Sequence, residues 1–535
     1  MMRLNSALLF FILFPCLLNA QPVWQAASGN TYNNPIIHAD FSDPDVCRAG
    51  NDFYMTASSF NCVPGLPILH STDLVNWKLI NYALPRLSYA PGFDKPQHGK
   101  GVWAPCIRYH NEMFYIFFPD PDHGIFMVKA KHPAGKWTHP VCIKEGKGLI
   151  DPTPLWDDDG KAYLAFAFAG SRAGIKSLLA VCSMSEDGTQ TYNDDVIVFD
   201  GHDEHPTVEG PKFYKRNGYY YIFAPAGGVS TGWQLVLRSK NVFGPYEPKI
   251  VMHQGSTNIN GPHQGAWVEG NNNEHWFIHF QDKGPYGRVV HLQPMQWKND
   301  WPLMGAVSPG KETGEPVEHF KKPDLPAGRP AYPVESDEFN STQLSLPWQW
   351  HANPHLTWAI PYPSQGVLRL FAAPLPENAV NLWDVPNLLL QKIPAPAFQV
   401  TAAITFNPLQ EDEQTGLVIM GRDYALLSVK KKNEKLWISQ IICKDADKGN
   451  AESIVAEQLL HTQTFFLRLK VSSGALCEFS YSEDGTTFRT LGNTFTARQG
   501  IWIGAKVGLF CLRKTFSNDA GYADVDWFRF EPPTR

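Results

Sequence analysis

Nine residues near the start of the chain, HADFSDPDV at positions 38–46, hold three carboxylates, Asp40, Asp43 and Asp45. A neutral carboxyl group can donate a proton, and an ionised one can accept a proton or attack carbon. Two carboxyl groups held in different protonation states could therefore catalyse hydrolysis. The alternative is a solvated acidic turn, so the question is which of the three aspartates, if any, belongs to a site.

Five segments share one pattern, a turn rich in Asn, Asp or Gly followed by an aromatic strand. Their markers recur every 48 to 61 residues, which predicts four-stranded propeller blades. We therefore expect five blades within residues 21–310. The segments are GNDFYMTAS, HNEMFYIFF, DDGKAYLAFAF, RNGYYYIFA and NNNEHWFIHF, and the markers are Tyr54, Tyr115, Tyr163, Tyr220 and Trp276.

The residues that precede these markers by 11 to 13 positions are Asp43, Trp103, Asp151, Glu209 and His263. In a propeller the first strand of every blade lines the central channel, and all first strands run the same way. Residues that begin these strands therefore meet at one end of the channel. Glu269 lies only seven residues before Trp276, so the register places it away from that end.

Carboxyl groups that meet in this way satisfy the requirement for hydrolysis of a glycosidic bond, in which one acid donates a proton and the other activates water or attacks carbon. Glu209 lies beside Val208 and close to Phe213, a setting that favours its neutral form. Asp43 lies in a more polar turn. Asp151 is a third acid, which could tune or orient the proton donor.

The second half of the chain has a different composition. A stretch rich in Pro, Gly and charge predicts a linker at residues 311–335. Nine or more short alternating runs follow, with no helical pattern, and they predict a β-sandwich over residues 336–535. The expected fold class is all-β, a five-bladed propeller followed by a sandwich.

Composition excludes several functions. The net charge is −6 and no long basic run occurs, so no nucleic-acid partner is expected.

Residues 1–20 carry one Arg and an apolar run, which predicts a signal peptide cleaved after Ala20 and export to the periplasm or the extracellular space. No later segment predicts a membrane span. The cysteines after the leader form no metal motif, and most are expected to be buried free thiols.

Several motifs carry a family resemblance. NPIIHADFSDPDVCRAGNDFYMTASSF resembles the opening of glycoside hydrolase family 43, and GVWAPCIRYHNEMFYIFF, LIDPTPLWDDDGKAYLAF and TVEGPKFYKRNGYYYIF resemble its next three blades. SDEFNSTQLSLPWQW and GYADVDWFRFE resemble the two ends of the concanavalin A-like domain, a jelly-roll sandwich, that follows in its β-xylosidases and α-L-arabinofuranosidases. The resemblance implies an exo-acting enzyme that releases terminal arabinofuranosyl or xylosyl units from plant cell-wall oligosaccharides.

Residue roles follow from the same resemblance. Asp43 matches the general base, Asp151 the residue that tunes the pKa of the acid, and Glu209 the general acid of an inverting mechanism. Phe60 and Trp103 match aromatic walls of the sugar pocket, and Arg288 matches an arginine that contacts the terminal sugar. The family segment commonly reads DPS where this chain reads DPD, which leaves the role of Asp45 open.

Metal sites are expected to be structural at most, and no cofactor is required. His263 matches a channel histidine that lies near a hydrated Ca²⁺ in relatives, and Asp337 and Asp526 are candidate ligands of a second Ca²⁺. Carboxylate oxygens are the ligands that Ca²⁺ prefers.

Other readings remain open at this point. The chain could be a carbohydrate-binding protein with an inactive propeller, or a sugar phosphorylase on a similar fold. Arabinose and xylose are not distinguished, and a sandwich loop such as GLFCLRKTF could close the pocket. The expected assembly is a monomer or a small homo-oligomer.

Overall fold

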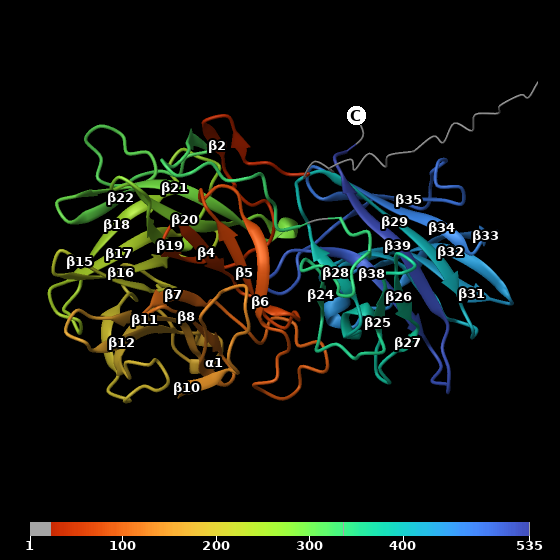
Figure 1. Ribbon diagram of the computed structural model, residues 1–535, viewed down its shortest axis with the longest axis horizontal. Helices are drawn as coiled ribbons and strands as arrows, with labels where there is room; N and C mark the ends of the chain where they lie inside the picture. Colours follow the sequence, from red (N-terminus) through yellow and green to blue (C-terminus); the bar gives the residue numbers. More distant parts are fainter. Residues whose placement is uncertain (1–22, 335, 534–535) are drawn as a thin grey trace, which may run out of the picture.

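The structure is a computed structural model that describes residues 23–334 and 336–533. It has two lobes, a ring of small sheets built from the first part of the chain and a two-layered lobe built from the second (Figure 1). This architecture confirms the predicted all-β fold class, a five-bladed propeller followed by a sandwich. The predicted signal peptide, residues 1–20, lies outside the described residues.

Five four-stranded antiparallel sheets form the propeller, each with its strands in chain order. The first three blades consist of β3 (Asp45–Ala49), β4 (Asp52–Thr56), β5 (Gly65–Ser71) and β6 (Lys78–Leu84); β7 (Cys106–His110), β8 (Met113–Asp120), β9 (Gly124–Ala130) and β10 (Val141–Glu145); and β11 (Leu149–Trp156), β12 (Ala162–Phe168), β13 (Leu178–Met184) and β14 (Val196–Asp200). The last two consist of β15 (Lys212–Arg216), β16 (Tyr219–Ala226), β17 (Trp233–Ser239) and β18 (Glu247–His253); and β19 (His263–Glu269), β20 (His275–Asp282), β21 (Arg288–Lys298) and β22 (Trp301–Met304).

The repeat seen in the sequence is the hairpin between the first and second strands of each blade. All five aromatic markers lie on second strands, β4, β8, β12, β16 and β20. In the turn between β15 and β16, Asn217 and Gly218 have φ of 50° and 72°, as a two-residue turn between twisted strands requires. The first strands line the centre, and β3 contacts both β7 and β19, which closes the ring.

The sandwich consists of two packed sheets that are antiparallel apart from the short parallel pair of β27 and β38. One sheet contains, in spatial order, β24 (Gln349–Trp350), β28 (Leu389–Lys392), β38 (Lys506–Arg513), β30 (Gln414–Met420), β31 (Tyr424–Lys432), β32 (Lys435–Cys443) and β33 (Ser453–Leu460), with β27 (Ala373–Pro374) beside β38. The other contains β25 (Ala359–Tyr362), β26 (Val367–Phe371), β39 (Tyr522–Glu531), β29 (Phe398–Asn407), β34 (Thr464–Ser472), β35 (Leu476–Ser482) and β36 (Arg489–Thr490), with β37 (Phe495–Thr496) beside β35.

One more small sheet combines the start of the described chain with the segment between the lobes. It contains β1 (Ala27–Ser28), β2 (Thr31–Asn33) and β23 (His319–Lys321). Residues 311–335, expected as a linker, thus contain a strand, because extended backbone there pairs with β2. The helical turns are short: α1 (Gly170–Ala173), η1 (Gly284–Tyr286), η2 (Leu382–Asp384) and η3 (Ala446–Lys448). Within the described residues, no helix is long and apolar enough to cross a membrane.

The two lobes share one hydrophobic core. Phe41 and Tyr286 of the propeller belong to the same buried cluster as Trp350 of the sandwich. Polar contacts cross the same boundary, since Asn353 Nδ2 donates to the Leu87 carbonyl and Asn353 Oδ1 accepts from the Leu87 amide, both at 2.9 Å. The sandwich therefore packs rigidly against the propeller, which lets it contribute to a site on the propeller face.

Candidate active site

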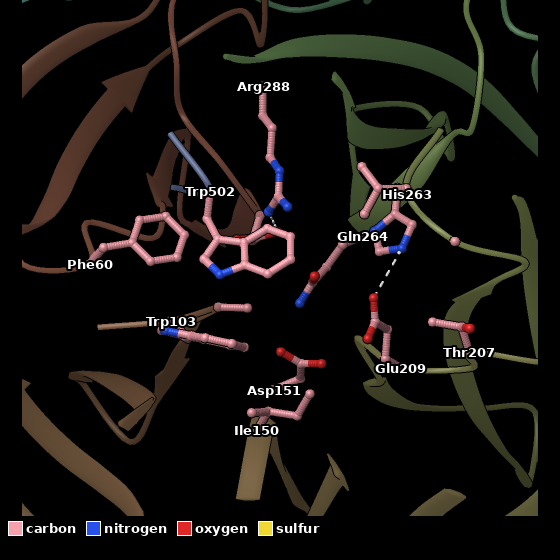
Figure 2. Close-up of a pocket in the computed structure, with 14 residues that line it drawn as sticks. Phe60, Trp103, Ile150, Asp151, Thr207, Glu209, His263, Gln264, Arg288 and Trp502 are labelled. Carbon is pink, nitrogen blue, oxygen red and sulfur yellow. Dashed lines mark hydrogen bonds and ion pairs between the residues drawn. The ribbon is translucent and has the colours of Figure 1, made fainter. Parts of the chain in front are cut away.

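A pocket of about 230 Å³ lies at the end of the channel where the first strands of the blades begin (Figure 2). All seven residues that the sequence places at the catalytic and sugar-binding positions line it. Glu269, which the repeat register places away from this end of the channel, does not line it. The lining residues are Asp43, Phe60, Trp103, Ala104, Ile150, Asp151, Thr207, Glu209, Gly228, Val229, His263, Gln264, Arg288 and Trp502.

Asp43 lies two residues before β3 and is held by three hydrogen bonds. Arg288 Nη1 donates to Oδ1 at 2.9 Å, and the hydroxyls of Ser42 and Ser58 donate to Oδ2 at 2.8 and 2.5 Å. An ionised carboxylate only accepts hydrogen bonds, so a ring of donors with an adjacent guanidinium suits the charged form. Asp43 is thus an oriented acceptor, able to take a proton from water.

Asp151 and Glu209 form the second acidic group of the pocket, opposite Arg288 in Figure 2. Asp151 Oδ2 accepts from the amide of Gly210 at 2.8 Å. Burial, then the negative charge of Glu209 and to a smaller extent that of Asp43, raise the pKa of Asp151 to about 7. A proton on either carboxyl group relieves their mutual repulsion, so this pair can retain a proton near neutral pH.

His263 begins β19 and is buried next to the acid pair. Its Nε2 lies 3.3 Å from Glu209 Oε1, the contact drawn as a dashed line in Figure 2. Phe280 packs against the imidazole with a ring-centroid distance of 5.3 Å. The imidazole is thereby held within ion-pair distance of the Glu209 carboxyl group.

Backbone strain is concentrated among the lining residues. Asp43, Phe60, Asp151, Thr207 and Gln264 all have φ between 37° and 58°, in the left-handed region that residues with side chains seldom adopt. At Asp151 the strain coincides with a β-bulge, because the register between β11 and β12 shifts between Ile150 and Thr153. Such bulges redirect side chains. The strained residues thus include two of the acids, Asp43 and Asp151, at the end of the channel where the pocket lies.

Aromatic rings form the opposite wall. The rings of Phe60 and Trp103 lie 6.4 Å apart, and Trp103 lies 6.1 Å from Trp502 of the sandwich. Trp103 is fixed by a 2.9 Å hydrogen bond from Nε1 to the Gly99 carbonyl. Flat apolar rings of this kind suit the faces of a sugar ring, while the acids and Arg288 supply polar contacts.

Trp502 is the aromatic lining residue that the sequence did not predict. The sequence left open whether a loop such as GLFCLRKTF, at 508–516, closes the pocket; this segment lies mostly in β38 between β28 and β30, so its backbone is paired within the sheet. The loop just before β38 approaches the pocket instead, with Trp502 half-exposed at a φ of 63°. In the sequence, the feature that could have pointed to this loop is a lone Trp between Gly500 and Gly504.

Asp45 does not line the pocket. Its fully buried carboxylate accepts from Ile107 N and Arg108 Nη1, both at 2.7 Å, and lies 3.7 Å from the Lys212 ammonium. Three blades are joined in this way beneath the acids. The open question of Asp45 therefore has a structural answer, because its charge balances those of the buried Lys212 and the partly buried Arg108. Lys212 also connects the cluster to the site, since its positive charge opposes the rise in the pKa of Asp151.

The candidate Ca²⁺ ligands do not fit a protein-bound metal. Asp337 accepts from Phe339 N, Ser345 Oγ and Trp348 Nε1 at 2.6 to 2.9 Å, so its oxygens serve as a turn cap. Asp526 is exposed on β39. Across residues 23–334 and 336–533, no group of three or more His, Cys, Asp or Glu side chains is placed to hold a metal, including around His263. Ca²⁺ prefers six to eight oxygen ligands, so no catalytic step is assigned to it.

Comparisons with known proteins agree with this geometry. The profile of the family described as Glycosyl hydrolases family 43 matches residues 32–302, and that of the Beta xylosidase C-terminal Concanavalin A-like domain matches residues 336–531. A protein of Xylanibacter ruminicola is 38% identical over 498 residues, which cover 91% of this chain and 87% of that protein.

Two further similarities extend over both lobes. The non-reducing end alpha-L-arabinofuranosidase BoGH43B of Bacteroides ovatus is 29% identical over 94% of each chain. The crystal structure of the GH43 protein BlXynB of Bacillus licheniformis has a TM-score of 0.82 at 26% identity, and the match covers 94% of this chain and 100% of that one.

Replacing Asp45 tests the buried charge cluster. Asp45→Asn should lower the free energy of unfolding by about 3 to 5 kcal/mol, because it leaves the charges of Arg108 and Lys212 without a partner. Urea denaturation measures the loss. Asp159→Asn, which breaks an exposed ion pair with Lys161, is the control and should cause no measurable change. Equal stability of the two variants would contradict the charge-balancing role of Asp45.

Replacing Asp151 tests the raised pKa through stability. The pKa of Asp151 is about 7 in the folded protein and about 3.8 when unfolded, so its ionisation reduces stability as pH rises from about 4 to 7. Asp151→Asn removes that ionisation. We expect its melting temperature to match that of the unmodified protein at about pH 3, where the carboxyl group is protonated in both states, and to exceed it by several degrees at about pH 7.5.

Asp484 provides a control of opposite sign. Hydrogen bonds from the amides of Thr487 and Thr486 lower the pKa of Asp484, so its charged form stabilises the fold above the unfolded value. Asp484→Asn should therefore reduce the melting temperature at pH 7.5. A pH-independent difference for Asp151→Asn would show that its carboxyl group has an ordinary pKa.

Proposed function

The chain belongs to glycosyl hydrolases family 43 and is a glycoside hydrolase, and from that premise we propose that it releases single α-L-arabinofuranosyl or β-D-xylosyl units from the non-reducing ends of plant cell-wall oligosaccharides. One observation carries the proposal: Asp43 is surrounded by donors, whereas the buried Asp151 and the partly exposed Glu209 form an acidic pair in the same pocket. The names of similar proteins, β-xylosidases and an α-L-arabinofuranosidase, support the choice of pentose.

Glu209 is the proposed general acid. It donates its proton to the glycosidic oxygen as the bond from that oxygen to the anomeric carbon breaks, and the oxygen keeps the bonding electron pair. Asp151 places a second carboxyl group beside it, which disfavours the loss of a proton from the pair. The Nε2 atom of His263 lies 3.3 Å from Glu209 Oε1, which is within ion-pair distance when the imidazole is protonated.

Asp43 is the proposed general base. It takes one proton from a water molecule whose oxygen attacks the anomeric carbon on the face opposite the leaving group. Its three hydrogen bonds hold the carboxylate in one orientation during this transfer. A single displacement of this kind inverts the configuration at the anomeric carbon.

The dimensions of the pocket support exo action. A space of about 230 Å³ walled by Phe60, Trp103 and Trp502 suits one terminal sugar ring better than the interior of a polymer. Phosphorolysis is less well supported. Among the lining residues Arg288 is the one Lys or Arg, and its Nη1 already donates to Ser42 and Asp43.

Two substitutions test the roles. Asp43→Asn and Glu209→Gln should each lower kcat/KM on xylobiose and on an arabinofuranosyl oligosaccharide by about 10²- to 10⁴-fold, the usual contribution of an acid or base. On 4-nitrophenyl pentosides Glu209→Gln should lose much less than Asp43→Asn, because nitrophenolate leaves without protonation. Proton NMR of the first product formed should show inverted configuration.

Glu269→Gln is the matched control, because Glu269 ends the same strand that His263 begins and lies outside the pocket. Its activity should equal that of the unmodified enzyme. Full activity of Asp43→Asn, or a product of retained configuration, would refute the mechanism.

A further inference from the structure

The pocket receives Trp502 because a loop of the sandwich docks on one turn of the propeller. The docking turn is residues 284–288, which contains η1 and ends at Arg288. The amide of Ala505 donates to the carbonyl of Pro285 at 2.8 Å. Tyr286 Oη donates to the Pro396 carbonyl at 3.0 Å and accepts from the Ala475 amide at 2.7 Å. Two pocket residues from different domains, Arg288 and Trp502, therefore lie on adjoining segments (Figure 2).

The carboxylate of Asp40 joins these two segments. Its Oδ1 accepts from the backbone amide of Arg288 at 2.9 Å, and its Oδ2 accepts from the backbone amide of Gly504, two residues after Trp502, at 3.0 Å. Asp40 is 3% exposed, so water competes little for these bonds. Each carboxylate oxygen therefore accepts a hydrogen bond from a different domain.

Close packing shows that the junction tolerates little displacement. A Cβ on Gly287 would lie 2.4 Å from Asp40 Cγ, and a Cβ on Gly504 would lie 2.7 Å from the amide nitrogen of Gly287. Both distances are shorter than any ordinary carbon contact. The two glycines let the backbones approach until both amides reach one carboxylate.

A buried cation from the sandwich faces the same carboxylate. Lys392, on β28, is buried with its ammonium 5.0 Å from the centre of the Phe41 ring. Burial lowers the pKa of Lys392 to about 8, and the negative charge of Asp40 opposes that shift. The charges of Lys392 and Asp40 thus attract each other across the junction, in addition to the two backbone hydrogen bonds.

We infer that Asp40 is a positioning residue that sets the distance between Arg288 and Trp502, so that the sandwich completes the sugar pocket. The inference rests on the proposed function, because it assigns these residues to the binding of the terminal sugar. A carboxylate is required, since both donors are amide N–H groups. An asparagine would offer one acceptor and turn an NH₂ group toward the other amide.

The test is a double-mutant cycle on kcat/KM for a 4-nitrophenyl pentoside. Asp40→Asn should lower kcat/KM about tenfold or more, as expected for lost hydrogen bonds to a charged group. In a Trp502→Ala background the same change should cost about threefold or less, because one of the two walls that it positions is already absent. A merely structural role would give the same factor in both backgrounds.

Asp73→Asn is the matched control. Asp73 is also a buried aspartate that accepts from backbone amides, those of Val75, Asn76 and Gly328, but it lies outside the pocket. It should lower the melting temperature without changing kcat/KM.

A second variant keeps the test valid if Asp40→Asn does not fold. Gly504→Ala leaves the carboxylate intact and forces the loops apart, and it should also lower kcat/KM about tenfold. Unchanged kcat/KM in Asp40→Asn or Gly504→Ala, or equal factors in both backgrounds of the cycle, would overturn the inference. Failure of the proposed function is distinct, because the unmodified protein would then hydrolyse no pentoside.

Discussion

The site depends on one electrostatic constraint. Several carboxyl groups must lie close together in one small pocket, although like charges repel one another and burial disfavours the charged form of each group. Each acid meets the constraint in a different way. Asp43 has the guanidinium of Arg288 and two hydroxyls. Asp151 has a raised pKa, because burial and Glu209 favour its neutral form. These different environments give the pocket an oriented acceptor, Asp43, and an acidic pair, Asp151 and Glu209, that can retain a proton.

Two neighbouring aspartates satisfy the same constraint outside the pocket. Asp45 is paired with Arg108 and lies near Lys212, and this cluster joins blades beneath the acids. Asp40 binds two backbone amides across the domain boundary. The acidic turn at 38–46 thus contains one aspartate in the pocket, flanked by one that connects blades and one that connects domains.

The sandwich is part of the active-site structure. It shares a hydrophobic core with the propeller, and Trp502 reaches the pocket from it. The loop before β38 can do so because the docking turn at 284–288 and the two glycines allow close backbone contact. Strained backbone at Asp43, Phe60 and Asp151 is maintained by this rigid surround, since left-handed residues persist only where packing determines them.

The sequence by itself determined the blade pattern, the family resemblance and the set of residues that meet in the channel. Propeller blades repeat a local hairpin, so an offset of 11 or 12 residues before the aromatic marker identifies Asp43, Asp151 and Glu209 without long-range information. Local composition also separated the two halves of the chain. These features are encoded within segments of about 50 residues, where periodicity and turn chemistry are visible.

Only the tertiary structure decided the partners of those residues. Asp40 and Gly504 are 464 positions apart, and Asp45 and Arg108 are 63 apart, so no local pattern connects them. The surroundings of Asp337, a candidate Ca²⁺ ligand, were likewise decided by the tertiary structure, because the hydrogen bonds that it accepts depend on how its turn folds. Sequence patterns indicate which side chains are near a strand end or a turn. Which charge balances which, and which loop of a second domain closes a pocket, depends on packing between surfaces that the chain order does not bring together.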